Sequence, residues 1–282
     1  MLFDRRAVEP ELDLFRPNHM EIVSLALRRK VMYACLLFLL IGCARKVPTF
    51  EPAEIPASVI VEHLEKEKDQ LRSFRAVGSI QVKGKKQHWS GRAFFVAELP
   101  GSLRLEVLNF FGQPVIYAAS DGHEFLIWEP GHNRAYEGLA RQGMLARLIE
   151  FPLDDQEAVL LLAGVVPMWH QVEQKLFKSL DTGMLLLQQW MDSSPWLTQK
   201  IWLEGGSEVV RKIERFRGGK LELEVKFAHF SDIDGWFYPR SIVMEGAETR
   251  VTIRYEQIAI NESLDQSVFH LTLPKGVEII PW

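Results

Sequence analysis

Several features that commonly define a function are scarce in this chain of 282 residues. It contains only two cysteines, Cys35 and Cys43, which are too few for a disulfide framework, so stability must come from a hydrophobic core. Its 33 basic and 37 acidic side chains give a formal net charge of −4, which lacks the basic excess of a nucleic-acid-binding protein. The composition therefore argues against a disulfide scaffold and against nucleic acid as a partner.

Catalytic and metal-binding motifs are lacking as well. The sequence contains no His-Glu-x-x-His motif, no Cys/His zinc spacing, no Gly-x-Ser-x-Gly turn and no glycine-rich phosphate loop. The adjacent carboxylates Asp154 and Asp155 precede a helical pattern, where they are expected to cap free backbone N–H groups. We therefore predict no catalytic residue, no metal site and no cofactor, and an enzyme is the least favoured class.

An export signal is present near the start of the chain. An Arg-Arg-Lys triplet at 28–30 precedes an apolar run of roughly ten residues, which ends in Leu-Ile-Gly before Cys43. This order is typical of a secretory signal, and the run is too short to span a membrane comfortably. We interpret residues 1–42 as a signal peptide with Met20 as the true start, because 1–19 carries acidic side chains where a basic region belongs. The alternative is a short membrane anchor or a buried helix with an incidental cysteine.

The residues around Cys43 resemble the bacterial lipobox, the cleavage motif of lipoproteins. That resemblance implies that Cys43 becomes the lipidated N-terminus of the mature protein. Two or three acyl chains anchor a protein durably without a membrane-spanning segment. Position 44 is Ala rather than Asp, which by the enteric sorting rule implies the outer membrane.

The rest of the chain divides into a tether and one folded part. Residues 43–56 contain three prolines, at 48, 52 and 56, which favour an extended spacer. Residues 57–282 contain no Pro/Gly/Ser-rich linker and are long enough to bury one core, so we expect a single domain.

Alternation of apolar and polar residues predicts a large antiparallel sheet. Residues 76–137 show this period with turn residues between segments, which indicates six strands, and residues after 184 indicate six more. Leu103, Leu105 and Val107 alternate with more polar neighbours, so one face of the sheet is expected to be apolar. The pattern predicts about eleven or twelve strands in total.

Helical patterns interrupt this sheet at two places. Residues 58–74 form an amphipathic helix in this interpretation, with Ser58 as its cap. Residues 143–164 indicate two short helices, 144–149 and 158–163, separated by a break at Pro152. We predict the α+β class, a strongly curved antiparallel sheet wrapped on a few helices.

The chain is rich in large apolar side chains, with 17 phenylalanines and 8 tryptophans. They could simply fill a core, since aromatic residues dominate most cores. They could equally line a cavity for an acyl chain, because each buried methylene contributes about 0.8 kcal/mol without any polar contact. Composition leaves both interpretations open.

One predicted hairpin tip has an unusual sequence. Asn109, Phe110, Phe111 and Gly112 lie between two strands, where turn chemistry favours polar residues. Because a loop tip has little core beneath it, at least one phenylalanine should face solvent. Exposed aromatic rings at a tip suggest insertion into a membrane or into a partner's groove. The alternative is that both rings fold back over the sheet edge.

Three segments are similar to the LolB family, the outer-membrane receptors that accept lipoproteins from the periplasmic carrier LolA. They are Phe-Arg-Ala-Val-Gly-Ser-Ile at 74–80, the hairpin 103–112, and the insert from Gly-Met-Leu at 143–145 to Leu-Ala-Gly at 162–164. The resemblance implies an open half-barrel covered by helices around an apolar cavity. The family's hairpin bears Asn-Pro-Leu-Gly, so Phe110 replaces the proline and Phe111 takes the place of the leucine that promotes delivery to the membrane.

The resemblance implies a lipid-anchored protein on the periplasmic face of the outer membrane that binds acyl chains and inserts lipoproteins. Its expected partners are the acyl chains of lipoproteins or other lipids, a LolA-like carrier and the membrane itself, and a monomer is expected. Two alternatives remain: the same fold binding another lipid or a glycolipid, or a scaffold subunit of an envelope complex.

Overall fold

The computed structural model describes residues 48–85, 88–140, 143, 151, 153–169, 172–191 and 196–281. The described residues from Pro48 onward form one compact unit. The proposed signal peptide and Cys43 therefore lie outside the described residues. No described helix is both long and apolar enough to span a membrane.

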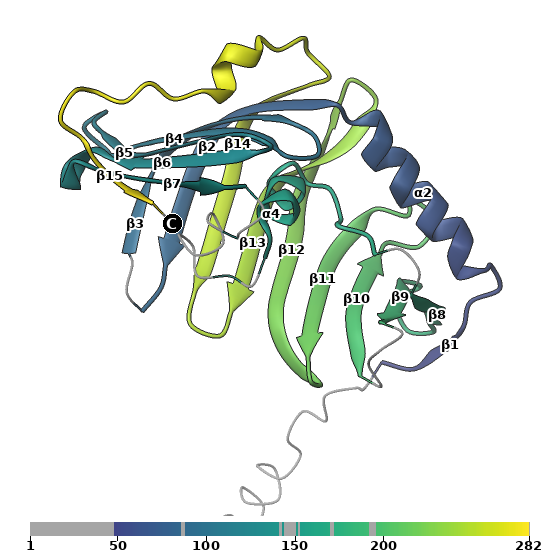
Figure 1. The fold of residues 1–282 in the computed structure, drawn as a ribbon. Helices are drawn as coiled ribbons and strands as arrows, with labels where there is room; N and C mark the ends of the chain where they lie inside the picture. Colours follow the sequence, from purple (N-terminus) through teal and green to yellow (C-terminus); the bar gives the residue numbers. More distant parts are fainter. Residues whose placement is uncertain are drawn as a thin grey trace, which may run out of the picture. The chain divides into compact units, whose positions relative to one another are not determined.

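The described residues form one fifteen-stranded sheet, in the order β1-β8-β9-β10-β11-β12-β13-β14-β2-β3-β4-β5-β6-β7-β15. All pairs are antiparallel except β15 with β7. The strands are β1 (Phe50–Pro52), β2 (Ser73–Lys83), β3 (His88–Glu98), β4 (Ser102–Leu108), β5 (Pro114–Asp121), β6 (Glu124–Glu129), β7 (Arg134–Leu139), β8 (Glu173–Ser179), β9 (Leu185–Trp190), β10 (Leu197–Leu203), β11 (Val210–Arg217), β12 (Lys220–Ile233), β13 (Trp236–Gly246), β14 (Arg250–Ile260) and β15 (Glu278–Pro281). The sheet is open and bends around a short helix, α4 (Figure 1). The predicted curved, open α+β fold is confirmed.

Alternation sets the two faces of this sheet. Leu103, Leu105 and Val107 are buried, and the residues between them are half-exposed. The same period in the neighbouring strands creates one inner apolar face, which packs against the helices in a single hydrophobic cluster. The six strands predicted between 76 and 137 are β2–β7, and the six predicted after 184 are β9–β14.

The expected strand number was too low because three strands lack a readable pattern. β1 has only three residues, β15 has four, and β8 (Glu173–Ser179) contains mostly polar residues. Short strands next to a sheet edge depend on long-range pairing rather than on their own period. Phe50–Pro52, placed in the tether by the sequence, pairs with β8 in this way.

Helix α2 (Ala57–Gln70) packs its buried Ile60 and Leu64 into the same cluster as the inner face of the sheet. The predicted helix is present, but two details of the prediction were wrong. Its N-cap is Pro56, with no side-chain cap, so Ser58 does not cap it. The helix also ends at Gln70 rather than Phe74, because Phe74 begins the pairing of β2 with β14.

Helix α4 (Asp155–Leu162) lies inside the curve of the sheet and is tied down at both ends (Figure 1). At its start, the Asp154 side chain and the Glu157 side chain form a reciprocal capping box, as the predicted capping role of Asp154 requires. At its end, the hydroxyls of Tyr238 and Tyr255 donate to the carbonyls of Ala163 and Leu162. The second predicted short helix is therefore confirmed, whereas the first, 144–149, lies outside the described residues.

A buried polar network fixes the start of α4 to the sheet. Glu157 accepts a hydrogen bond from Arg215 Nη1 at 2.8 Å, and its second carboxylate oxygen forms an ion pair with Arg215 Nη2 at 2.7 Å. Arg215 also donates to Gln199, and Gln199 donates to Gln189, both of which are fully buried. Such paired, hydrogen-bonded charges hold one geometry because breaking the pair leaves a costly buried charge.

The chain after β14 crosses the outer face of the sheet. The short 3₁₀ helix η2 (Gln266–Phe269) packs against β4 and β5, where Phe269 is buried. Arg104 of β4 donates to the His270 carbonyl at 3.2 Å. A second 3₁₀ turn, η1 (Pro130–His132), joins β6 and β7. The segment thus covers the outer face of β4–β5, and it contacts the outer face of β2 and β3 through Glu262 beside Arg75 and Gln266 beside Glu98.

Candidate functional site

The hairpin tip between β4 and β5 is held by Asn109. Its side-chain oxygen accepts hydrogen bonds from the backbone N–H groups of Phe111 and Gln113, at 2.9 and 3.0 Å. Backbone bonds from Asn109 to Gln113 (2.8 Å) and from Gly112 to Asn109 (3.0 Å) complete the turn. Gly112 has a φ of +75°, which a side chain would strain. Asn109 and Gly112 therefore fix the geometry of the tip.

The two phenylalanines of this tip point into solvent. Phe110 is 97% exposed and Phe111 is 82% exposed, and their rings meet edge to face at 5.6 Å. They do not fold back over the sheet edge, so that alternative is wrong. The structure thus presents two adjacent aromatic rings on a turn that its own hydrogen bonds make rigid.

An apolar groove lies between α2 and the sheet, on the inner side of β11–β13. We call it the α2 groove; its volume is about 440 Å³. Its apolar wall includes Leu64, Leu71, Val210, Phe227, Phe230 and Trp236. The volume is in the range of small-molecule sites, which are mostly apolar clefts with few polar groups. The α2 groove is therefore the apolar space that the described helices and sheet leave open.

One rim of the α2 groove is polar. His63 on α2 lies 3.5 Å from the Glu67 carboxylate and 3.7 Å from that of Glu208, in the loop between β10 and β11. Burial raises the pKa of Glu67; His63 opposes this shift and Glu208 adds to it. His63 therefore lies between Glu67 of α2 and Glu208 on the opposite rim.

Two further contacts hold the aromatic wall of the groove in place. Phe230 and Phe237 stack at 5.3 Å, and the Arg211 guanidinium lies 4.2 Å from the Phe230 ring. Both contacts are typical of stabilising aromatic and cation–π pairs. The rings are therefore held in place before any ligand arrives.

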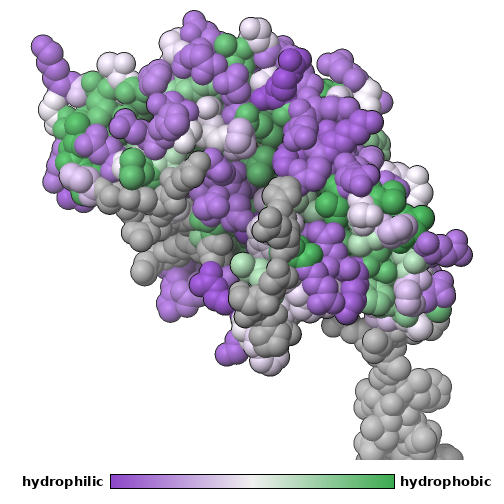
Figure 2. Space-filling model, turned by 45° about the vertical axis from the view of Figure 1, so that its right-hand side comes forward, coloured by the Kyte–Doolittle hydropathy of each residue, from purple (hydrophilic) through white to green (hydrophobic). Residues whose placement is uncertain are grey.

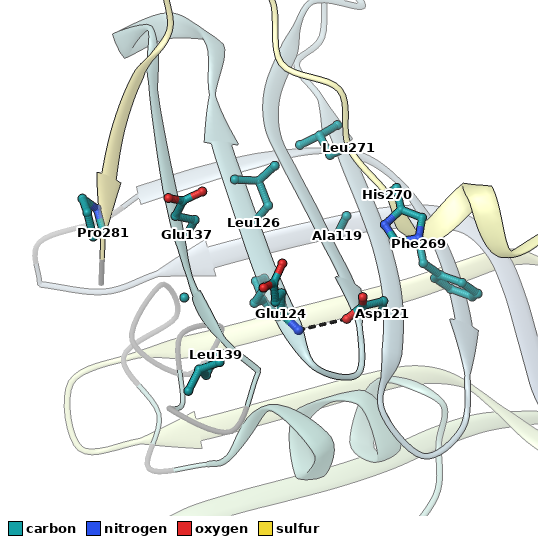
Figure 3. A pocket seen from close by; sticks show the side chains of 12 residues that line it. Ala119, Asp121, Glu124, Leu126, Glu137, Leu139, Phe269, His270, Leu271 and Pro281 are labelled. Atoms are coloured by element: carbon teal, nitrogen blue, oxygen red, sulfur yellow. Dashed lines mark hydrogen bonds between the residues drawn. The ribbon is translucent and has the colours of Figure 1, made fainter.

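A second pocket, of about 500 Å³, lies between β5–β7 and the C-terminal segment (Figure 3). Its lining mixes carboxylates, from Asp121, Glu124 and Glu137, with leucines. Asp121 accepts backbone bonds from His123 and Glu124, at 2.8 and 2.9 Å, and these bonds lower its pKa. No cluster of three or more potential metal ligands occurs in the described ranges. The Asp121 carboxylate stabilises the β5–β6 turn. Because three carboxylates line this pocket, it suits an acyl chain less well than the α2 groove does.

The surface on the side of α2 is mostly hydrophilic. Figure 2 turns this side forward and shows hydrophobic atoms in separate patches rather than one continuous apolar face. An apolar ligand on this side would therefore need a groove to leave water.

Sequence reasoning located the tip but missed the groove. The tip depends on four consecutive residues, whereas the groove brings α2 together with β11–β13 across long stretches of chain. One signal was available: Phe227, Phe230, Trp236, Phe237 and Tyr238 crowd the β12–β13 hairpin. Cys43, the third predicted site, lies outside the described residues.

Comparison with known proteins gives likenesses of structure alone. No family model and no curated protein matches the sequence. The structure is similar to a putative outer membrane lipoprotein-sorting protein domain from Vibrio parahaemolyticus, with a TM-score of 0.53 and 11% identity over 75% of this chain and 94% of that one. It is also similar to a DUF1329 family protein from Desulfovibrio piger, with a TM-score of 0.50 and 9% identity over 75% and 95% of the two chains. The chain therefore shares the fold of these two proteins.

Proposed function

We propose that this protein is a lipid-anchored lipoprotein on the periplasmic face of the outer membrane, which binds acyl chains and inserts incoming lipoproteins. The observation that carries the proposal is the rigid tip with Phe110 and Phe111 exposed. Aromatic rings held in water lose that unfavourable contact when they enter a membrane. The proposed role needs no catalytic group, metal or cofactor.

The proposed route of a lipoprotein passes two sites on this protein, the α2 groove and the tip. A LolA-like carrier delivers the acyl chains, which leave water by entering the α2 groove between Leu64 and the aromatic wall of β12–β13. The tip then enters the inner leaflet and provides an apolar path for release. Transfer proceeds without an energy source if each site binds the acyl chains more tightly than the site before it, because each step then lowers the free energy of the bound chains.

The proposed anchor keeps these parts close to the membrane. The segment between Cys43 and Phe50 can span at most roughly 25 Å when fully extended. The sheet edges also fit a monomer, because β1 and β15 are short and end in Pro52 and Pro281. Proline at an edge blocks pairing with a second sheet.

Substitution of Phe111 tests this proposal directly. Phe111→Glu should leave the fold intact, because the ring is 82% exposed, yet strongly reduce lipoprotein insertion into the outer membrane. Phe111→Leu is the matched control and should retain function, since leucine is also apolar. Insertion is measured in cells by separating the two membranes and quantifying a reporter lipoprotein. Normal insertion with Phe111→Glu would show that the tip has no such role.

A second candidate keeps the fold and changes the ligand. The α2 groove, at about 440 Å³, is small for several acyl chains, and α4 fills the centre of the curve. This favours a binder of one lipid or glycolipid. The ligand recovered from the purified protein separates the two candidates. A groove that accepts no apolar probe would support a scaffold subunit instead.

A further inference from the structure

The outer face of β14, β2 and β3 is basic. Its outward positions alternate with buried core residues such as Ile80, Ala93 and Ile253. In the half of the three strands that includes Lys83, the outward residues are Ser79, Gln81, Lys83, His88, Ser90, Arg92, Arg250, Thr252 and Arg254. None of these positions carries a carboxylate, whereas Glu98 of β3 and Glu256 of β14 lie toward the other end of the strands. In a protein of net charge −4, this basic face is a local reversal of charge.

Two arginines stand on either side of a serine in the middle of this face. Ser79 of β2 is the register partner of Arg92 on β3 and of Arg254 on β14. Adjacent strands lie about 4.8 Å apart, so the two arginine backbones are roughly 10 Å from each other. The short Ser79 side chain leaves space between them, into which two guanidinium groups can reach from opposite sides.

These two arginines lack the acidic partners that most others have. Ion pairs with glutamates neutralise Arg75, Arg104, Arg134, Arg211, Arg215, Arg217 and Arg250. Within the described part of the chain, Arg92 and Arg254 have no such pair, and the Arg92 guanidinium instead lies 5.7 Å from the Phe94 ring. The nearest outward carboxylate on β4, Glu106, is already bound by Arg104 at 2.7 Å. Two unpaired, exposed guanidinium groups therefore face solvent together.

The arginines line a groove that reaches the aromatic tip. This outer groove has a volume of about 680 Å³, and its lining includes Arg92, Arg254 and Ser79 together with Asn109, Phe110 and Gly112 of the tip. Gln81, Ser90 and Thr252 supply further hydrogen-bonding groups along it. Cationic groups and an apolar tip thus border one depression.

We infer that Arg92 and Arg254 bind the phosphate of an anionic phospholipid headgroup while the tip is in the membrane. Guanidinium groups are suited to phosphate because their N–H donors match its oxygens in pairs. A headgroup lies at the depth where the apolar tip leaves the bilayer, which is where the groove begins. The inference rests on the membrane contact in the proposed function, and it adds a preference for negatively charged lipid.

Vesicle binding tests this inference. The Cys43→Ala protein, exported behind an ordinary cleavable signal peptide in place of residues 1–42 so that it is secreted and unlipidated, is mixed with vesicles of phosphatidylcholine, or of phosphatidylcholine with phosphatidylglycerol, and bound protein is measured by co-sedimentation. We expect tighter binding to the anionic vesicles, which weakens with salt. Replacing Arg92 and Arg254 by Gln should reduce the affinity for anionic vesicles roughly five-fold for each arginine and leave binding to neutral vesicles unchanged.

The matched control removes the same charge elsewhere. Arg217→Gln with Lys220→Gln alters two exposed cations at the β11–β12 turn, outside the groove, and should have little effect. Unchanged thermal unfolding verifies that each variant is folded. If the Arg92/Arg254 variant binds anionic vesicles as the control does, the inference is wrong.

Two further measurements distinguish the arginine site from insertion of the tip and from a site for small anions. Phe111→Glu should weaken binding to both kinds of vesicle, so loss of tip insertion is distinguishable from loss of the arginine site. Sodium phosphate is compared with sodium chloride at equal ionic strength. If inorganic phosphate binds to the wild-type protein and not to the double glutamine variant, while both proteins bind anionic vesicles equally, the arginines form a site for small anions, which contradicts a headgroup site.

Discussion

Phe110 and Phe111 differ from the other exposed apolar side chains of the described residues. Single exposed leucines and isoleucines are common on protein surfaces, and here Leu139 and Leu180 are 58% and 59% exposed. The two phenylalanines are adjacent, almost fully exposed and mounted on a turn fixed by Asn109. Because four consecutive residues determine this arrangement, it could be predicted from the sequence.

Asp121 provides a pH-dependent prediction at the scale of one residue. Backbone bonds from Glu124 and His123 lower its pKa below the ordinary aspartate value. A lowered pKa stabilises the fold at pH values above the unfolded-state pKa, and this contribution is lost as the pH falls through the folded-state pKa. Asp121→Asn should therefore cost on the order of 0.5 kcal/mol near neutrality, a small value because solvent screens the site. The difference from wild type should vanish in acid.

Urea unfolding at a series of pH values measures that difference. Asp69→Asn on α2 is the control, since it removes an exposed carboxylate that has no comparable backbone bonds among the described contacts. A stability difference for Asp121→Asn that stays constant down to strongly acidic pH would contradict the assigned role.

The twelve predicted strands were recovered because each has its own alternating pattern. Elements without one were missed: β1 and β15 are short, and β8 has little apolar character. The prediction of the α2 cap was wrong for a related reason. Ser58 resembles a cap in sequence, but the chain turns into the helix at Pro56, and neighbouring contacts rather than local propensity decide that point.

Gly78 is required by a close approach of two strands, which the alternation of apolar and polar residues does not predict. It lies in the Phe-Arg-Ala-Val-Gly-Ser-Ile segment, and a Cβ at this position would be 2.0 Å from the Arg254 carbonyl oxygen. The register between β2 and β14 shifts beside Tyr255, so the two backbones approach closely there. Glycine is needed for this approach, which no sequence period reveals.

At the scale of elements, α4 should depend on its tyrosine bonds. Tyr255 is fully buried and donates to the Leu162 carbonyl at 2.6 Å, and burial raises its pKa. Tyr255→Phe leaves a helix-end carbonyl without this donor and should reduce the free energy of unfolding by about 1–3 kcal/mol. Tyr117→Phe, on the outer face, should have little effect because its hydroxyl makes no comparable described bond. Equal stability of the two variants in urea would contradict the anchoring role.

At the scale of the whole fold, the curved sheet separates two kinds of surface. Its inner side holds the packed core, α4 and the apolar α2 groove, whereas the outer side of β14, β2 and β3 is basic. The tip lies where the outer groove ends. The sequence predicted the open sheet, but it could not assign the groove, because a one-residue register error moves every strand residue to the opposite face.

The most direct test of the proposed function is to identify what the α2 groove holds. The Cys43→Ala protein, exported behind an ordinary cleavable signal peptide in place of residues 1–42, is purified from periplasm and studied by native mass spectrometry with lipid extraction. We predict recovery of acylated lipoprotein peptides, and their loss in Phe230→Asp, which places a charge in the groove wall. Leu221→Asp, exposed on the same strand, should retain them. A protein that is empty and also rejects a fluorescent apolar probe would contradict the account.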